Sequence, residues 1–161
     1  MTTSPPARDA YRNVPLSALL YVTRGTYTAA VRRAQAKVGC GDVPVTGEAL
    51  LNAMAWSGAP FNTVARFLGI SKQAISQTVE TLVTRGYLNR AEDPADRRRM
   101  KLTLTARGER AGKAGRAAIE EVDRELISRV GPGRFAHARE TLVVLLEIKR
   151  RNLALGAKEG A

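Results

Sequence analysis

The sequence predicts a mainly α-helical fold with one small β-hairpin, and three observations support this prediction. Apolar residues recur at three- and four-residue steps over most of the chain, which is the period of a helix face. Between residues 64 and 84, two such patterns are separated by a glycine and a serine that suit a tight turn. Residues 99–104 instead alternate between polar and apolar side chains, as the returning strand of a hairpin does. This is the pattern of a winged helix-turn-helix with additional helices at both ends.

Taken in order, residues 1–14 include Pro5 and Pro6 and are expected to form a flexible arm. Residues 15–45 are expected to form an N-terminal dimerisation helix and the loop after it, with Gly39-Cys40-Gly41 ending the helix. The apolar stripe of this helix comprises Leu16, Leu19, Leu20, Thr23, Tyr27, Ala30, Val31, Ala34 and Val38. Thr46 is expected to cap the next helix, which Gly58 and Pro60 end.

Residues 46–105 are expected to form the winged helix-turn-helix. Gly69 stands where the first helix of the pair must end, Ile70 fills the space under the turn, and Ser71 is a good N-cap for the second helix. The buried stripe of that helix is predicted to be Ala74, Ile75, Thr78, Val79 and Leu82.

The opposite face of the second helix is polar. It carries Ser71, Lys72, Gln73, Ser76 and Gln77, followed by Glu80. Hydrogen-bonding side chains near the start of such a helix suit the major groove, because base edges present donors and acceptors there. A solvated helix face would look the same, so this helix pair alone leaves DNA binding undecided.

The hairpin strengthens the DNA-binding prediction. Its first strand is expected to begin at Tyr87, and Pro94 suits the turn. The returning strand carries Arg97, Arg98, Arg99 and Lys101. Arginine suits phosphates and a narrow, negative minor groove, and Asp96 can pair with one arginine and hold the tip in shape. The alternative is a charged, solvent-exposed loop that does not bind DNA.

These residues resemble a known family. The segment D-P-A-D-R-R-R-M-K-L-T-L-T-A-R-G is similar to the wing signature of the MarR family of bacterial transcription regulators, with Asp96, Arg98, Leu104, Thr105 and Gly108 at the matching positions. The segment G-I-S-K-Q-A-I-S-Q-T-V-E-T-L-V-T-R-G-Y-L-N-R resembles that family's recognition helix and first wing strand. The resemblance implies a homodimer whose recognition helices enter major grooves. It also implies that Arg98 enters a minor groove and that Asp96 organises it.

Residues 106–161 are expected to form C-terminal dimerisation helices, with Thr105 as the first N-cap and Gly131-Pro132-Gly133 as an interruption. The apolar stripes of these helices and of the first helix are too long for a small winged domain to cover. Burial between two chains would cover them, as the family resemblance implies, and an intrachain bundle is the alternative. A two-fold dimer would place its recognition helices about 34 Å apart and favour a pseudo-palindromic operator in double-stranded DNA.

Composition excludes several other classes of protein. The net charge of +11 favours a polyanionic partner, but the charge is spread along the chain and does not locate a site. We expect no membrane span and no signal peptide, and one cysteine fits the reducing cytoplasm. His137 and Cys40 alone make no zinc site and no supported nucleophile–base pair, so we expect no metal, no cofactor and no enzyme.

The sequence contains two further candidate sites. Cys40 is expected to be partly exposed between two glycines, which would permit redox sensing, although Lys37 is the one nearby cation. Resemblance to the family also implies a small aromatic or phenolic effector at the junction of the dimer helices and the winged domain. The candidate lining residues are Tyr21, Arg24, Tyr27, Arg32 and Trp56, although such residues at helical spacing are more often plain core.

The function that the sequence favours is a dimeric, sequence-specific transcription regulator, expected to be a repressor. The alternative is a non-specific or architectural nucleic-acid-binding protein that uses the same basic surface with little base readout. The two differ in the ratio of specific to non-specific affinity and in its dependence on salt.

Overall fold

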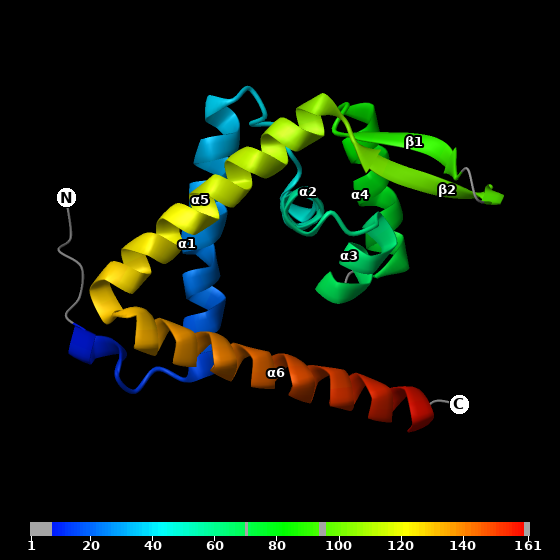
Figure 1. The fold of residues 1–161 in the computed structure, drawn as a ribbon. Coiled ribbons are helices and arrows are strands. Elements are labelled where there is room, and N and C mark those ends of the chain that lie inside the picture. Colours follow the sequence, from blue (N-terminus) through cyan, green and yellow to red (C-terminus); the bar gives the residue numbers. More distant parts are fainter. Residues whose placement is uncertain (1–7, 70, 94–95, 160–161) are drawn as a thin grey trace. The chain divides into compact units, whose positions relative to one another are not determined.

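The computed structural model describes residues 8–69, 71–93 and 96–159, with the side chains of residues 8, 72, 92–93, 96–100 and 153–159 excluded (Figure 1). The described elements are a short 3-10 helix η1 (Arg8–Tyr11), helices α1 (Leu16–Lys37), α2 (Val45–Ser57), α3 (Phe61–Leu68) and α4 (Lys72–Thr84), strands β1 (Leu88–Asp93) and β2 (Asp96–Leu104), and helices α5 (Ala106–Val130) and α6 (Pro132–Glu159). This is the predicted fold class.

The chain forms two compact units, and the boundary between them lies within α5. The first unit ends at Glu120 and the second begins at Glu121. The predicted segment boundaries at residues 45/46 and 105/106 therefore fall inside the first unit, and the division into an arm, dimerisation helices and a DNA-binding domain stays a prediction.

Helix α2 lies at the centre of the first unit, in contact with α3, α4 and β2. Leu50 and Leu51 of α2 are completely buried, as are Leu82 of α4 and Tyr87. Gly47 lets α4 approach closely, because a Cβ at that position would lie 2.9 Å from a methyl carbon of Leu82. The core therefore fixes α4 on α2 along the stripe that the sequence predicts.

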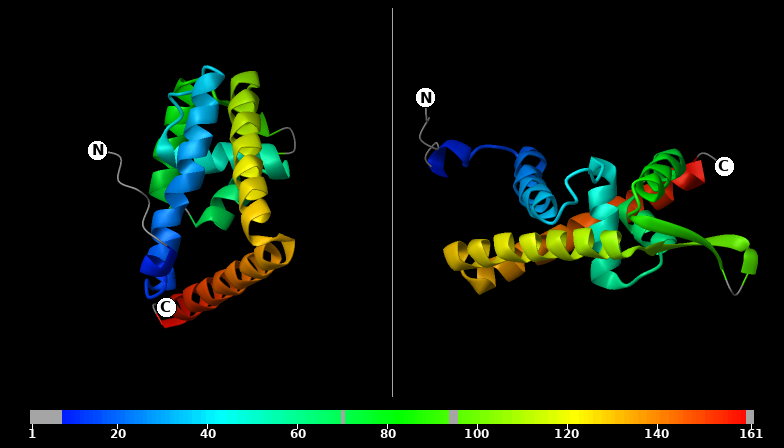
Figure 2. Two further views of the ribbon diagram at one scale, coloured as in Figure 1. Left: turned by 90° about the vertical axis from the view of Figure 1, so that its left-hand side faces the viewer. Right: turned by 90° about the horizontal axis from the view of Figure 1, so that it is seen from above.

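Helix α5 packs on α2 through glycines. A Cβ on Gly112 would lie 2.5 Å from the Cβ of Ala55, and one on Gly115 would lie 2.0 Å from Oδ1 of Asn52. Beside them, the Ala111 carbonyl accepts a 3.3 Å hydrogen bond from the buried side-chain amide of Gln35. The first part of α5 is thus held against both α2 and α1 (Figure 2).

The helix ends largely follow the sequence. The Ser71 hydroxyl accepts a 3.3 Å hydrogen bond from the Ala74 amide, and the Thr105 hydroxyl accepts one of 3.0 Å from the Gly108 amide, so both predicted caps are confirmed. Gly69 has the expected positive φ of 67°. Ile70 lies outside the described residues.

The cap predicted at Thr46 is wrong. Helix α2 begins at Val45, and its N-cap, Pro44, makes no side-chain hydrogen bond. Thr46 lies inside the first turn, where its hydroxyl is 3.1 Å from the hydroxyl of Thr78. Proline pre-sets the φ that helix entry requires, and Thr46 is then free to contact α4.

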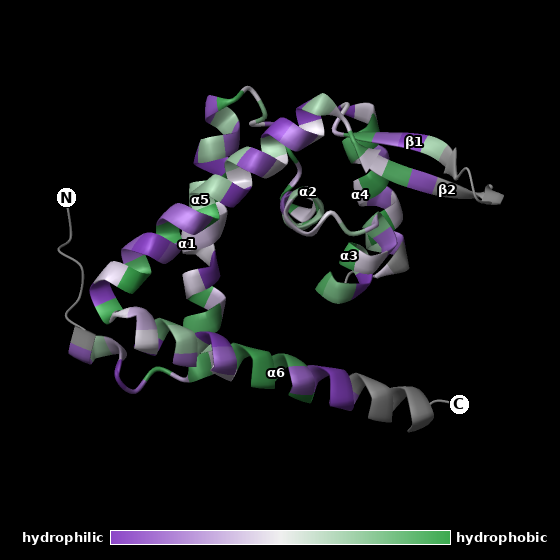
Figure 3. Ribbon diagram, in the orientation of Figure 1, coloured by the Kyte–Doolittle hydropathy of each residue, from purple (hydrophilic) through white to green (hydrophobic). Residues whose placement is uncertain are grey.

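The N-terminal half of the apolar stripe predicted for α1 is exposed in the single chain. Of the described side chains of α1, Val31 and Gln35 are buried, whereas Leu16 is 56% exposed and Tyr21 is 81% exposed. In the second unit, α6 is apolar along its middle (Figure 3). Its exposed apolar residues are Leu142, Val143, Val144, Leu145, Leu146 and Ile148.

Among the described residues, no helix combines the length and the apolar character that crossing a membrane requires.

Candidate nucleic-acid interface

Helix α4 presents a polar face. Thr78, Val79 and Leu82 are buried on the side that faces the core. The other side exposes Ser71, Gln73, Ser76 and Gln77, which are four of the five residues predicted to read DNA in this helix. The side chain of the fifth, Lys72, lies outside the described part of the structure. The Ser71 hydroxyl is engaged as the helix cap.

The end of α4 is closed by a Schellman motif. Gly86 adopts a positive φ of 71°, its amide donates to the Val83 carbonyl at 2.9 Å, and the Tyr87 amide donates to the Leu82 carbonyl at 2.8 Å. These bonds satisfy the last carbonyls of the helix and turn the chain directly into the hairpin. Three residues therefore join the recognition helix to the wing, and the middle one, Gly86, has a left-handed conformation.

Strands β1 and β2 form an antiparallel hairpin that projects beyond the helices of the first unit (Figures 1 and 2). Leu88 pairs with Leu104 at the base, Ala91 pairs with Lys101 nearer the tip, and the register shifts between Glu92 and Asp93. The first strand begins at Leu88 rather than at Tyr87, because the Tyr87 amide is used by the Schellman motif.

The predicted wing residues lie along β2. Lys101 is exposed. Arg90 of β1 is also exposed, opposite Leu102, and it was not among the predicted site residues. Arg97, Arg98 and Arg99 belong to the described backbone of β2, but their side chains and that of Asp96 lie outside the described residues. The expected pairing of Asp96 with an arginine therefore stays a prediction.

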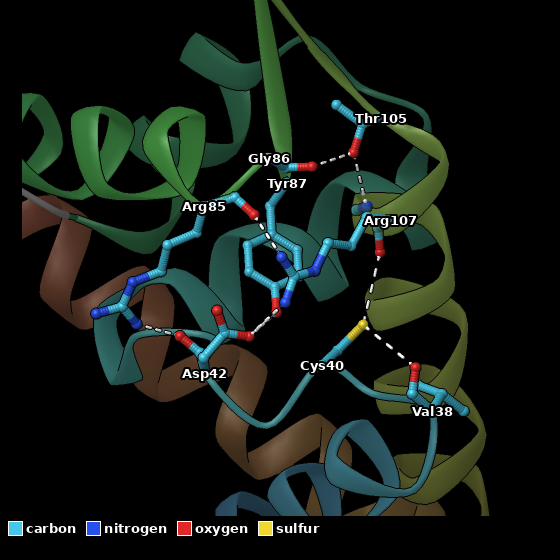
Figure 4. A network of polar contacts seen from close by, with 9 residues as sticks. Val38, Cys40, Asp42, Arg85, Gly86, Tyr87, Thr105 and Arg107 are labelled. Atoms are coloured by element: carbon cyan, nitrogen blue, oxygen red, sulfur yellow. Dashed lines mark hydrogen bonds and ion pairs between the residues drawn. The ribbon is translucent and has the colours of Figure 1, made fainter.

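A polar network joins the base of the wing to the loop between α1 and α2 (Figure 4). One carboxylate oxygen of Asp42 accepts a hydrogen bond from the Tyr87 hydroxyl and a 2.8 Å hydrogen bond from the Arg107 guanidinium. That guanidinium also lies 4.6 Å from the centre of the Tyr87 ring. Asp42 and Arg107 are 65 positions apart, and no local sequence pattern indicates that they form a pair.

The network shifts the pKa values of its members. The hydrogen bond from Tyr87 has the largest effect and lowers the pKa of Asp42. Burial opposes it, and the Arg107 and Arg85 guanidinium groups lower the pKa by smaller amounts. Burial raises the pKa of Tyr87, and its bond to Asp42 raises that pKa further. Both shifts favour the same state, in which an ionised carboxylate accepts a hydrogen bond from a neutral phenol.

Cys40 is not partly exposed, as the sequence suggested, but completely buried. Its sulfur lies 3.7 Å from the carbonyl oxygen of Val38 and 3.9 Å from that of Arg107. The flanking glycines turn the chain inward, with a φ of 73° at Gly39, so the thiol enters the core. Redox sensing at Cys40 would require a partly exposed thiol, which the structure does not provide.

His137 is exposed on α6. In the described part of the chain, no three metal-ligating side chains gather.

The first unit contains two cavities that bear on ligand binding. One, of about 650 Å³, lies between the α2–α3 junction, strand β2 and the start of α5. It is lined by apolar residues that include Met54, Phe61 and Leu104, and by the polar or charged residues Asn62, Lys101, Thr103, Glu109 and Lys113. The other, of about 450 Å³, lies between the end of α1 and the start of α2 and is lined in part by Arg32, Arg33 and Glu48.

The structure does not bring the five residues predicted to line an effector site into either of these cavities together. Arg32 lines the smaller cavity, where it pairs at 2.7 Å with a Glu48 side chain that is 8% exposed. Tyr21 and Trp56 are 81% and 68% exposed. Arg24 is exposed and Tyr27 is half-buried on α1.

Comparison with known proteins agrees with this geometry. Residues 49–99, which extend from α2 into β2, match the model of the MarR family. A probable transcriptional regulator from Pseudomonas aeruginosa has a similar fold, with a TM-score of 0.62 and 27% identity over 83% of this chain and 98% of that one. No curated protein matches the chain.

Two structures at lower identity share the fold. MepR from S. aureus, in complex with DNA, has a TM-score of 0.65 and 19% identity over 84% of this chain and 98% of that one. A MarR family protein from Mycobacterium tuberculosis, in complex with salicylic acid, has a TM-score of 0.56 and 23% identity over 83% of this chain and 98% of that one. Through this matched segment and its winged helix-turn-helix, the chain is similar to regulators of the MarR family, and these findings support a DNA-binding transcription regulator.

Proposed function

We propose that the protein is a homodimeric repressor that binds a pseudo-palindromic site in double-stranded DNA and leaves it when a small aromatic anion binds. The observation that carries sequence-specific binding is the exposed polar face of α4. Gln73 and Gln77 are exposed one turn apart on that face, and a glutamine side chain can donate to and accept from a single base edge. The similar fold of MepR in its DNA complex supports this mode of binding.

Dimerisation is supported by apolar surface. The exposed residues Leu142, Leu145 and Leu146 of α6, and Leu16 of α1, are large apolar side chains that a second copy can remove from water. A two-fold dimer would place two copies of α4 about one turn of B-DNA apart, or about 34 Å. Light scattering at micromolar concentration tests this part, and a mass of one chain would contradict it.

The alternative is non-specific or architectural binding. It is favoured by the net charge of +11, which attracts any polyanion, and by the spread of that charge along the chain. Non-specific binding releases counterions from phosphates and weakens steeply with salt for every sequence alike. The exposed glutamines favour specific readout, because a solely electrostatic surface has no need of neutral hydrogen-bonding side chains.

The deciding experiment is selection of bound fragments from random and genomic DNA at two salt concentrations. A specific dimer should return a pseudo-palindrome with half-sites about one helical turn apart at both concentrations. If no consensus emerges and binding disappears as salt increases, the architectural function is correct. Positions of the recovered sites relative to promoters then test repression, which a reporter gene measures directly.

We propose that the effector binds in the cavity of about 650 Å³, whose lining includes Lys101, Lys113, Phe61 and Leu104. Two ammonium groups beside apolar side chains suit an aromatic carboxylate or phenolate. Lys101 also belongs to strand β2 of the wing, so an anion bound there would compete directly with DNA phosphate for a wing cation. The salicylic acid complex of the similar mycobacterial structure supports this class of ligand.

Thermal shift with salicylate tests the effector site, with salicylamide as the neutral analogue. Salicylate should raise the melting temperature of the wild type, and Lys113→Met should reduce that shift, because the substitution keeps the length of the side chain and removes its charge. Lys37→Met, on the exposed end of α1, is the matched control. If Arg32→Met abolishes the shift in melting temperature and Lys113→Met does not, the ligand binds beside Arg32, one of the five residues that the sequence predicted.

A further inference from the structure

The loop between α1 and α2 contacts three elements of the DNA-binding machinery at one residue. The Asp42 carboxylate accepts hydrogen bonds from Tyr87, which precedes β1, and from Arg107 in the first turn of α5. The main-chain carbonyl of Asp42 accepts a further hydrogen bond from Arg85, the C-cap of α4. These side chains converge on Asp42 in Figure 4.

The three partners are also joined to one another. The Arg107 guanidinium donates a 2.9 Å hydrogen bond to the Arg85 carbonyl. The Thr105 amide donates to the Tyr87 carbonyl at 3.1 Å, and the Thr105 hydroxyl donates to the Gly86 carbonyl at 2.6 Å. The end of the recognition helix, both ends of the hairpin base and the start of α5 therefore form one hydrogen-bonded junction.

We propose that Asp42 is a positioning residue for DNA recognition, which sets the angle of the wing relative to α4 through Tyr87, Arg85 and Arg107. This inference rests on the proposed sequence-specific function. Asp42 itself need not touch DNA. Its carboxylate completes the junction by accepting two hydrogen bonds that no neutral side chain would accept as strongly.

The length of the hairpin makes this angle important. From Leu88 to Asp93 the strand rises about 17 Å, at about 3.3 Å per residue. A rotation of about 10° at the base would therefore displace the far end of the strand by about 3 Å. A hydrogen bond to a base or phosphate tolerates a few tenths of an ångström. Base-specific contacts at both α4 and the wing thus require a fixed base, whereas attraction to phosphate over longer distances does not.

Removing the Asp42 carboxylate should have opposite effects on affinity for the selected DNA site, depending on whether Asp42 acts through its charge or by positioning the wing. Asp42→Asn makes the protein more positive, so electrostatics alone would strengthen binding to every duplex. If Asp42 positions the wing, the same substitution should weaken binding to the selected site while leaving non-specific affinity unchanged or higher. The ratio of the two affinities therefore separates positioning from charge.

The experiment compares Asp42→Asn, Tyr87→Phe and a matched control, Glu120→Gln. The control makes the same change of charge and removes the Arg116–Glu120 ion pair, which is exposed on α5 and shares no residue with the junction at Asp42. Affinities for the selected site and for an unrelated duplex are measured below the melting temperature of each variant. We expect the ratio to fall on the order of tenfold in Asp42→Asn, similar to one mismatched base pair, and less in Tyr87→Phe. Glu120→Gln should keep the wild-type ratio.

A lower melting temperature with an unchanged ratio in both Asp42→Asn and Tyr87→Phe would overturn the inference, because the junction would then be structural only. Tyr87→Phe keeps the aromatic ring and removes one hydroxyl, so it serves if Asp42→Asn does not fold. Hydrogen exchange of the Thr105 amide in the free protein gives a second readout, and it should be faster in Asp42→Asn than in Glu120→Gln. If the wild type shows no preference for any duplex, the proposed function fails, and an unchanged exchange rate would then overturn the positioning role separately.

Discussion

Gly108 lies directly against the main-chain carbonyl of Tyr87. A Cβ at residue 108 would be 2.1 Å from that oxygen, which is well inside van der Waals contact. The same carbonyl accepts the hydrogen bond of the Thr105 amide, so it cannot move away without breaking the junction between the hairpin and α5. Gly108, the last matching position of the wing signature, is thus explained by a close approach of two backbones.

Gly108→Ala should therefore destabilise the protein by about 1–3 kcal/mol, as overpacking does in a close-packed interior. Gly25→Ala is the matched control, because a Cβ at residue 25 of α1 would meet no atom within 4 Å. That substitution should stabilise by about 0.5–1 kcal/mol, since glycine disfavours a helix. Urea unfolding measures both, and equal effects of the two substitutions would contradict the close approach.

Stability should decline in alkaline solution because of Tyr87. The pKa of Tyr87 is raised in the folded protein, chiefly by burial, whereas the unfolded chain ionises at its usual pKa of about 10. The unfolded state therefore loses its proton first, and the free energy of unfolding should decrease as pH rises above about 10. Tyr87→Phe should remove this part of the decline in urea midpoints between pH 8 and pH 11. Tyr21→Phe, at a side chain that is 81% exposed, should leave it in place.

The Arg32–Glu48 ion pair should matter more to stability than an exposed pair. Glu48 is 8% exposed and Arg32 is 51% exposed, whereas both members of the Arg116–Glu120 pair are 50% exposed. Arg32→Met leaves a buried carboxylate without its cation and should cost about 1–3 kcal/mol, after allowance for the exposure of Arg32. Arg116→Met should cost about 0.5 kcal/mol or less. Thermal or urea unfolding of the two variants decides this, and similar losses would be inconsistent with the burial of Glu48.

Arg98→Ala should weaken DNA binding on the order of 1–3 kcal/mol and relax the base preference at the flanks of the site. Gln73→Ala and Gln77→Ala should instead change the preference at the centre of each half-site. Arg134→Ala, on α6, removes the same charge as Arg98→Ala and is the control for electrostatics. Binding to a panel of mutated sites measures all four. Wild-type affinity in Arg98→Ala would show that the wing assignment is wrong.

The parts of the fold that the sequence predicted correctly depend on contacts between near neighbours. The hydroxyl of Ser71 caps α4 three residues on, and that of Thr105 caps α5 in the same way. Gly69 ends α3 with a positive φ, and alternation along β2 indicated the hairpin. These features are set by steric and hydrogen-bonding preferences over three or four residues, which a single sequence contains.

The parts that were missed depend on contacts between distant segments. Asp42 pairs with Tyr87 and Arg107, which are 45 and 65 residues away, and nothing near Asp42 indicates either partner. Cys40 was expected to be partly exposed from its flanking glycines, but those glycines turn it into the core. Likewise, the period of α1 showed an apolar face without showing what covers it. A helical pattern identifies the apolar face of one helix, but burial of that face also depends on the surface that packs against it.

The glycine contacts of α5 limit how this region can vary between related proteins. The methyl group of Ala55 occupies the space that a side chain at residue 112 would need, and the amide of Asn52 occupies that of residue 115. A side chain at residue 112 can therefore persist only if residue 55 becomes smaller, whereas at residue 115 the end of the Asn52 side chain can turn aside. Residues 55 and 112 should change together in evolution, so that a methyl group gained on one helix is matched by a loss of volume on the other.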